Sequence, residues 1–248
     1  MSDIALPIRP PPRGVDLPTD DGEPLETGRH RDQMELLIGS LKASYVERRD
    51  VFVGGNMFVY YSETQAKKND FRGPDVFVVV GCDPKERRSW VVWEEEGRTP
   101  DVVIELLSET TAAVARGTKK RIYAQLMKVS TYVLFDPWTG ELEAYELDLG
   151  TLMYRPIEAD PSGRVLCKPL GLLLGAEPGS FRDIEARWLR WLTPGGTVLR
   201  HGDEAAVFEK RRADDEKRRA DDEKRRADDL EAQLRGLTAR AAKDGAAG

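Results

Sequence analysis

The sequence has few cysteines and no long apolar run. Its two cysteines, Cys82 and Cys167, lie far apart and match no metal-ligand spacing, which predicts reduced thiols in the cytoplasm rather than a disulfide framework or a structural zinc site. No segment approaches the roughly 20 apolar residues of a membrane span. The first residues, MSDIALPIRPPPRG, lack the apolar stretch of a secretory signal, so we expect no membrane partner.

The sequence also lacks an excess of positive charge. Its formal net charge is −6, which argues against a protein that coats nucleic acid without specificity. Basic clusters remain at residues 67–68, 85–88 and 119–121, and a modestly acidic protein can still bind DNA through such a patch. The simpler interpretation of any one cluster is a solvated face.

The length of 248 residues predicts one domain with appendages. Residues 1–28 are rich in proline and acidic side chains and predict a disordered tail. Residues 29–200 predict the folded domain, residues 201–240 a charged helix, and residues 241–248 a second disordered end.

The charged helix is predicted from an internal repeat. Residues 209–229 read EKRRADD three times, and opposite charges four residues apart stabilise an isolated helix by about 0.2–0.5 kcal/mol per pair. Apolar side chains fill both seam positions only in the last two heptads, through Leu230, Leu234 and Leu237. The repeat therefore predicts an exposed helix whose end can join a partner in a short coiled coil.

The folded domain begins with a helix and β-rich segments. Apolar residues at steps of three and four predict a helix over residues 30–47. Residues 51–53 and 57–61 flank the turn Gly54-Gly55-Asn56 and predict a hairpin. The continuous apolar runs 75–80 and 101–107 predict central strands that are buried on both faces.

The second half of the domain predicts a crossover. A helix over residues 110–127 separates the strand near residue 104 from a strand over 132–135, which predicts a right-handed parallel connection. Residues 142–154 predict another hairpin, and residues 165–200 predict a short strand followed by an aromatic-rich segment. The predicted fold class is α/β, with a mixed sheet flanked by helices.

Two carboxylates fall on the predicted central strands. Glu105 lies inside an apolar run, where a carboxylate is costly unless it reaches solvent, a local arginine, a lysine or a metal ion. Asp75 opens the other strand, and strand ends of open α/β sheets are where sites form. Lys119, one helical turn before Tyr123, can point back toward the strand of Glu105. Two carboxylates and a lysine at one sheet edge suit Mg²⁺ and an anionic substrate.

Asp101 and His30 are two further candidates for metal ligands at this site. Asp101 also follows a proline, but it lies four residues before Glu105 on one strand, about 13 Å away, which is too far for a shared metal ion. Asp75 is therefore preferred. His30, at the start of the first predicted helix, is interpreted as a capping or packing residue rather than a ligand.

Several segments together resemble the Uma-two-type restriction endonuclease family of the PD-(D/E)XK nuclease superfamily. They lie within residues 30–175 and read HRDQMELLIGSL, VFVGGNMFVYYS, GPDVFVVVG, RRSWVVWEEEGRTPDVVIELLS, KKRIYAQL and YVLFDP. The resemblance implies a restriction-endonuclease-like fold. It also implies a Mg²⁺-dependent endonuclease, with Mn²⁺ as a substitute, that hydrolyses DNA phosphodiester bonds. A homodimer is expected, because duplex cleavage needs two active sites.

The resemblance also assigns roles to individual residues. Asp75 corresponds to the metal-binding aspartate of the PD motif, and Glu105 to the acidic residue of the (D/E)XK motif. The carbonyl of Leu106 is an additional metal ligand. The lysine position of that motif is Leu107 here, and Lys119 substitutes for it from the following helix.

Two neighbours of Lys119 and one departure from the family pattern bear on DNA binding and activity. Lys120 and Arg121 are candidates for nucleic-acid binding. The acidic residue common four positions before the helix lysine is Ala115 here. This change favours a second hypothesis, a catalytically weak or inactive nuclease fold used as a binding or assembly module. A third hypothesis is an α/β protein of another function.

Overall fold

The computed structural model describes residues 10–17, 27–63 and 72–244. By its internal contacts the chain forms two units, Met1–His201 and Gly202–Gly248. Of the terminal segments predicted to be disordered, the structure describes residues 10–17, with a short 3₁₀ turn, η1 (Gly14–Asp16), residues 27–28 at the start of the first helix, and residues 241–244, which are helical. The rest of these segments lies outside the described residues.

The centre of the first unit is a six-stranded sheet. Its strands, in order across the sheet, are β1 (Val51–Gly54), β3 (Val76–Val80), β5 (Val102–Leu106), β6 (Thr131–Phe135), β7 (Leu142–Asp148) and β8 (Met153–Pro156). β5 and β6 are parallel, and the other neighbours are antiparallel. These pairings confirm the α/β class with a mixed sheet, the parallel connection and the hairpin within residues 142–154.

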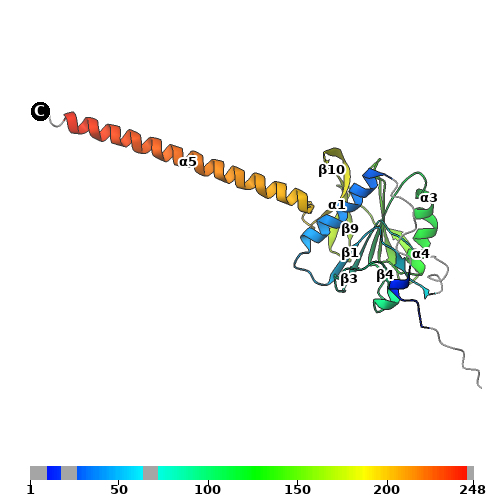
Figure 1. The fold of residues 1–248 in the computed structure, drawn as a ribbon. Helices are drawn as coiled ribbons and strands as arrows, with labels where there is room; N and C mark the ends of the chain where they lie inside the picture. The colour runs from blue at the N-terminus through cyan, green and yellow to red at the C-terminus, as the bar shows by residue number, and fades with distance from the viewer. Residues whose placement is uncertain (1–9, 18–26, 64–71, 245–248) are drawn as a thin grey trace, which may run out of the picture. The chain divides into compact units, whose positions relative to one another are not determined.

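Alternate residues of the central strands enter two different cores. Ile104 and Leu106 of β5 pack in the cluster that includes helix α1 (Gly28–Ser44), whereas Val103 and Leu107 pack in the opposite cluster. Figure 1 shows α1 and the helical segment α3–α4 on opposite sides of the sheet. Burial on both faces explains why these strands are continuous apolar runs.

Helix α1 begins at a side-chain cap. The Thr27 hydroxyl accepts a hydrogen bond from the His30 backbone N–H at 3.2 Å, and the His30 ring nitrogen Nδ1 lies 2.9 Å from the same hydroxyl. His30 is buried at this end of the helix. It thus occupies the capping and packing position that the sequence indicated.

The crossover helix contains a wide turn. It consists of α3 (Ala112–Val114), the π-helical turn η3 (Ala115–Lys119) and α4 (Lys120–Gln125). The Lys120 N–H donates to the Ala115 carbonyl five residues earlier. A π turn of this kind changes which residues face the sheet, and it is common at functional sites.

The hairpin predicted across Gly54-Gly55-Asn56 is wrong. β1 pairs with β3, and the strand after the turn, β2 (Val59–Tyr60), pairs in parallel with β4 (Trp90–Val91) in a separate small sheet. The short 3₁₀ turn η2 (Val92–Glu94) follows β4. The glycines therefore carry the chain from one sheet to another instead of reversing it beside its own strand.

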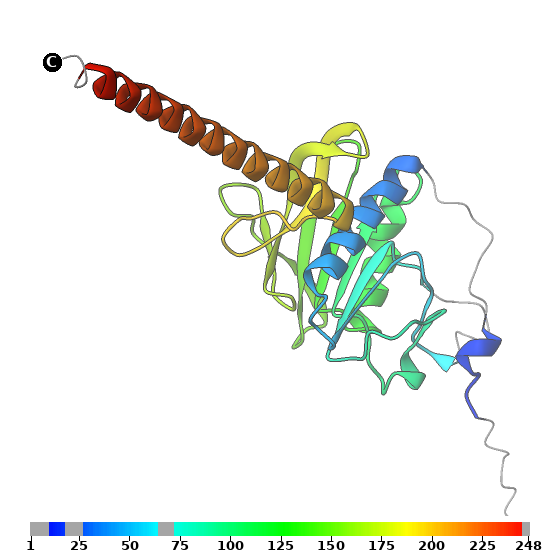
Figure 2. The same ribbon diagram turned by 60° about the vertical axis from the view of Figure 1, so that its left-hand side comes forward.

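A second antiparallel sheet completes the unit. It contains β9 (Val165–Cys167), β10 (Leu172–Phe181) and β11 (Ile184–Leu192), where the sequence predicted only a short strand and an aromatic-rich segment. The side-chain amide of Gln33 in α1 both donates to and accepts from the Leu189 backbone at 2.9 Å. Figure 2 shows α1 (blue) beside the β10–β11 hairpin (yellow).

The second unit contains helix α5 (Gly202–Asp244). Its 43 residues correspond to a length of roughly 65 Å, and the side chains over residues 206–227 are exposed. Among the described residues, no helix is long and apolar enough to cross a membrane.

Candidate active site

Asp75 directly precedes β3, and Glu105 lies in β5. The last pair of the ladder between these strands is Val76 with Ile104, and continuing this register places Asp75 opposite Glu105. Directly opposite residues of an antiparallel pair point to the same face, with their Cβ atoms about 4.5–5.5 Å apart. Asp75 Oδ2 also accepts a hydrogen bond from the Leu106 N–H at 2.7 Å, which fixes this carboxylate against β5.

Glu105 is a buried charge with two protein donors. Its side chain is 3% exposed. Lys119 Nζ donates to Oε2 at 2.8 Å, and the Tyr123 hydroxyl donates to Oε1 at 2.7 Å. Both donors come from the crossover helix, which covers this face of the sheet. The cost of burying the carboxylate is thereby offset by an ion pair and a hydrogen bond.

The helix is shaped to present both donors. Lys119 ends the π turn and Tyr123 follows four residues later, so their side chains lie on one face. The carbonyl of Ala115, at the start of the π turn, also accepts a hydrogen bond from the buried Tyr132 hydroxyl at 3.0 Å. The turn is thus anchored to β6 while its far end faces Glu105.

The environment of Lys119 keeps its ammonium charged. Burial lowers the pKa of this group, but the Glu105 carboxylate, together with Asp75, raises it more, so that the net pKa lies above the ordinary value. Lys119 therefore stays protonated up to the ordinary lysine value of about 10.5, and on the alkaline side the ion pair is lost only as the pH rises through the higher folded-state pKa. At neutral pH, Lys119 can orient a molecule or stabilise negative charge, but it cannot accept a proton.

The tyrosines around Glu105 stay neutral for a related reason. Burial raises the pKa of the Tyr123 hydroxyl well above its ordinary value, and the neighbouring Glu105 charge raises it further. The pKa of Tyr132 is raised by the same two causes. Tyr123 is therefore a dependable hydrogen-bond donor to the carboxylate across the physiological pH range.

The donor set fits a hard divalent cation. Asp75 and Glu105 supply carboxylate oxygens. Since the N–H and C=O of one strand residue face the same neighbouring strand, the Leu106 carbonyl lies on the side of Asp75, like its N–H. Mg²⁺ is commonly held by one or two carboxylates and completes its shell with water. Among the described residues, no group of three His, Cys, Asp or Glu side chains is arranged to hold a metal ion, so protein carboxylates could fill only part of such a shell.

The other predicted residues lie away from the Glu105 ion pair. Asp101 Oδ2 accepts from the Val80 N–H at 2.7 Å, at the opposite end of β3 from Asp75. Lys120 stands over the Tyr145 ring at 3.1 Å from its centre, so that its charge has a neighbour within the protein. Arg121 is exposed and forms no ion pair with a described residue.

The sequence does not single out two residues near the site. It predicts only a helical position for Tyr123, whereas the Tyr123 hydroxyl donates to Glu105 directly. Arg72 lies close enough to Lys119 to oppose the rise in its pKa. A polar side chain four residues from a candidate lysine was an available signal for Tyr123, whereas nothing in the sequence marks Arg72.

Comparisons with known proteins identify a family and a similar solved structure. A family model described as "Uma2: Putative restriction endonuclease" matches residues 5–181. Among solved structures, the chain is similar to a putative nuclease belonging to DUF820 from Anabaena variabilis ATCC 29413, with 15% identity and a TM-score of 0.40 over 58% of this chain and 74% of that one. A search of curated proteins found no match.

Proposed function

The chain belongs to the Uma2 family, whose description is "Putative restriction endonuclease", and from this premise we propose that it is a divalent-metal-dependent endonuclease that hydrolyses DNA phosphodiester bonds. The observation that carries the proposal is the buried Glu105–Lys119 ion pair of 2.8 Å on the strand beside Asp75. Two carboxylates and a fixed ammonium at one sheet edge match what phosphodiester hydrolysis requires.

Each residue has a proposed role. Asp75 and Glu105, with the Leu106 carbonyl, would hold Mg²⁺ or Mn²⁺, which when bound polarises a phosphoryl oxygen and acidifies water. Lys119 would orient the attacking water or stabilise the charge that develops on the phosphate. Tyr123 would hold Glu105 in one orientation.

The proposed partners follow from the same chemistry. DNA is the proposed substrate, with Lys120 and Arg121 as contacts to its phosphates. A homodimer would place two such sites on the two strands of a duplex. The end of helix α5 is the proposed site of any coiled-coil pairing.

A plasmid-nicking assay tests the proposal. The full-length chain should nick supercoiled DNA in Mg²⁺ and not in EDTA. Glu105→Gln and Lys119→Met should each lower the rate by about two to three orders of magnitude, as expected for the loss of a preorganised electrostatic group. Glu177→Gln is the matched control, because it breaks the 2.7 Å ion pair with Arg164 between β10 and the loop before β9 and should leave nicking unchanged.

One observation favours the second candidate, an inactive nuclease fold that serves as a binding or assembly module. Both oxygens of Glu105 already accept hydrogen bonds from the protein, so this buried charge is satisfied by side chains alone. This candidate would be supported over the nuclease if the folded chain left DNA intact in both Mg²⁺ and Mn²⁺, so that it could not be distinguished from the Glu105→Gln variant in the nicking assay.

A further inference from the structure

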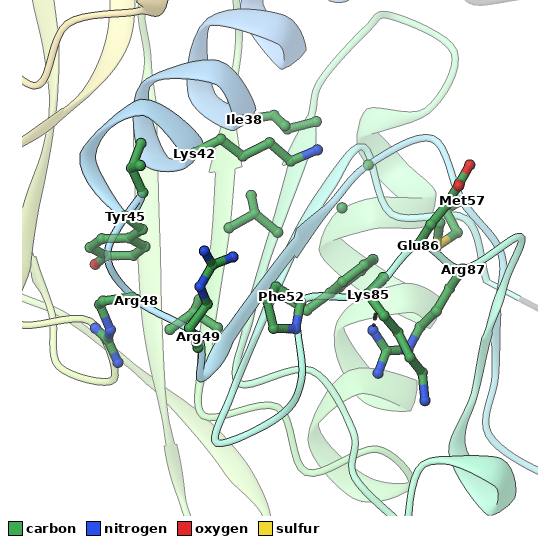
Figure 3. Close-up of a pocket in the computed structure, with 16 residues that line it drawn as sticks. Ile38, Lys42, Tyr45, Arg48, Arg49, Phe52, Met57, Lys85, Glu86 and Arg87 are labelled. Atoms are coloured by element: carbon green, nitrogen blue, oxygen red, sulfur yellow. Dashed lines mark hydrogen bonds between the residues drawn. The ribbon is translucent and has the colours of Figure 1, made fainter.

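A positively charged groove runs beside the edge strand β1. It has a volume of about 560 Å³ and is bordered by the end of α1, by β1 and by residues 84–87 (Figure 3). Its lining contains one acidic side chain and five basic ones, although the whole chain is acidic. The basic residues are Lys42, Arg48, Arg49, Lys85 and Arg87. The groove is therefore a local concentration of positive charge that would attract an anionic ligand.

Three of these cations are available to a ligand. Arg48 and Arg87 are held in ion pairs with carboxylates at 2.9 and 2.6 Å. Lys42, Arg49 and Lys85 are exposed and form no ion pair within the part of the chain that the structure describes. Figure 3 shows Lys42 on α1 and Arg49 near the start of β1, both lining the groove.

The groove leads toward the candidate active site. Gly55 lines the groove, and a Cβ at this position would lie 2.3 Å from the carbonyl oxygen of Asp75. The Asn56 N–H donates to the same oxygen at 3.2 Å. All four residues of β1 line the groove, which therefore follows this edge strand over about 13 Å. Its lining residue Gly55 lies against the backbone of Asp75.

We propose that this groove holds the phosphate backbone of a nucleic acid strand whose scissile phosphate lies at Asp75 and Glu105. The inference rests on the proposed function and adds a contact surface to it. Lysine and arginine side chains position a backbone without reading its sequence. A groove that is basic and open, and whose lining residue Gly55 adjoins the backbone of Asp75, suits such a strand better than it suits an acidic peptide.

Equilibrium binding tests the groove separately from catalysis. Fluorescence anisotropy of a labelled DNA duplex is measured with the full-length chain in EDTA, so that cleavage does not contribute. The double variant Lys42→Ala/Arg49→Ala should lose about tenfold or more in affinity. The plot of log affinity against log salt concentration should become shallower, its slope decreasing in magnitude by about 1.8, or about 0.9 for each lost phosphate contact.

The matched control is Arg31→Ala/Lys128→Ala, which removes one arginine and one lysine from exposed positions outside the groove. It should leave affinity and salt slope unchanged. Equal losses in both double variants would overturn the inference. Displacement of DNA by poly-glutamate at the same charge concentration, as effective as by unlabelled DNA, would overturn it in favour of an acidic peptide.

The two proposals fail in different ways. A chain that binds DNA through the groove but never nicks it in Mg²⁺ would refute the endonuclease, and with it a scissile phosphate at Asp75 and Glu105, while supporting the groove as a nucleic-acid-binding surface. The groove alone would be refuted if the chain nicks DNA and the Lys42→Ala/Arg49→Ala variant has the same DNA affinity and the same kcat/KM as the control variant.

Discussion

Glu105 is a carboxylate that the sheet tolerates because one helix supplies both of its partners. Lys119 neutralises one oxygen and Tyr123 donates to the other. Removing one member of such a buried pair typically costs about 3–5 kcal/mol, because the remaining charge is left uncompensated. Glu105, Lys119 and Tyr123 therefore form a coupled group, and the effects of substituting two of them are not expected to add.

Tyr123→Phe tests the positioning role of the tyrosine hydroxyl. Because a buried carboxylate oxygen loses its donor, the free energy of unfolding should fall by about 1–3 kcal/mol. The nicking rate should also fall, because Glu105 is no longer fixed. Urea denaturation and plasmid nicking measure the two effects.

The control for Tyr123→Phe is Tyr154→Phe. The Tyr154 hydroxyl donates to the Val129 carbonyl at 2.8 Å, so its loss should lower stability similarly while nicking is unchanged. Equal nicking by the two variants would show that the Tyr123 hydroxyl contributes to stability alone.

The candidate site was predictable from the sequence in part. Asp75 and Glu105 stand out because each carboxylate adjoins or interrupts a buried strand, and Lys119 because of its place on the next helix. The hydrogen bond from Leu106 to Asp75 depends on strand register, which the sequence does not state. Tyr123 was missed because a tyrosine on the buried face of a helix is usually a core residue, and only its position four residues after Lys119 indicates a contact with Glu105.

At the scale of elements, buried strands were easier to predict than their partners. β3 and β5 were predicted because short apolar runs bounded by turn residues are typical of buried strands and too short for most helices. The hairpin after β1 was wrong, because a glycine-rich turn does not determine which strands pair. The β10–β11 hairpin was missed because its turn lacks the residues that usually indicate a hairpin. Its two turn residues, Arg182 and Asp183, have φ angles of 50° and 62°, in a position where Asn-Gly is the usual signal.

The turn after β1 allows a test of how an element supports the site. An added methyl group in Gly55→Ala would meet the Asp75 carbonyl oxygen at 2.3 Å and the Ile38 side chain at 2.6 Å. Since one of these atoms belongs to the backbone, the strand end that carries Asp75 must shift. We expect a loss of about 1–3 kcal/mol in unfolding free energy, as for other overpacked sites, together with reduced nicking.

Gly117→Ala is the control for Gly55→Ala. Gly117 lies in the π turn, and a Cβ there would meet no atom within 4 Å. This substitution should stabilise the helix by about 0.5–1 kcal/mol and preserve nicking. Thermal denaturation and nicking measure both variants, and full activity in Gly55→Ala would show that Asp75 does not depend on the turn.

At the scale of the whole molecule, charge is sorted into regions. Each EKRRADD heptad contains three acidic and three basic residues, so the repeat in α5 adds no net charge. The groove beside β1 is basic within an acidic chain. Attraction of a polyanion should therefore originate in the first unit and not in the repeat, although the repeat contains many of the lysines and arginines.

The same reasoning predicts the effect of removing α5. Over residues 209–225 the described ion pairs join residues of the helix itself, for example Arg212 to Glu216 at 3.4 Å, and the side chains over residues 206–227 are exposed. A chain that ends at His201 should therefore keep the melting temperature of the full-length protein within about 2 °C, since surface changes rarely exceed 0.5 kcal/mol. It should also keep its affinity for DNA in EDTA. Calorimetry and anisotropy provide the two measurements, and sedimentation of both chains shows whether α5 sets the oligomeric state. A fall in melting temperature of more than about 5 °C, without a change in that state, would mean that the helix stabilises the first unit directly.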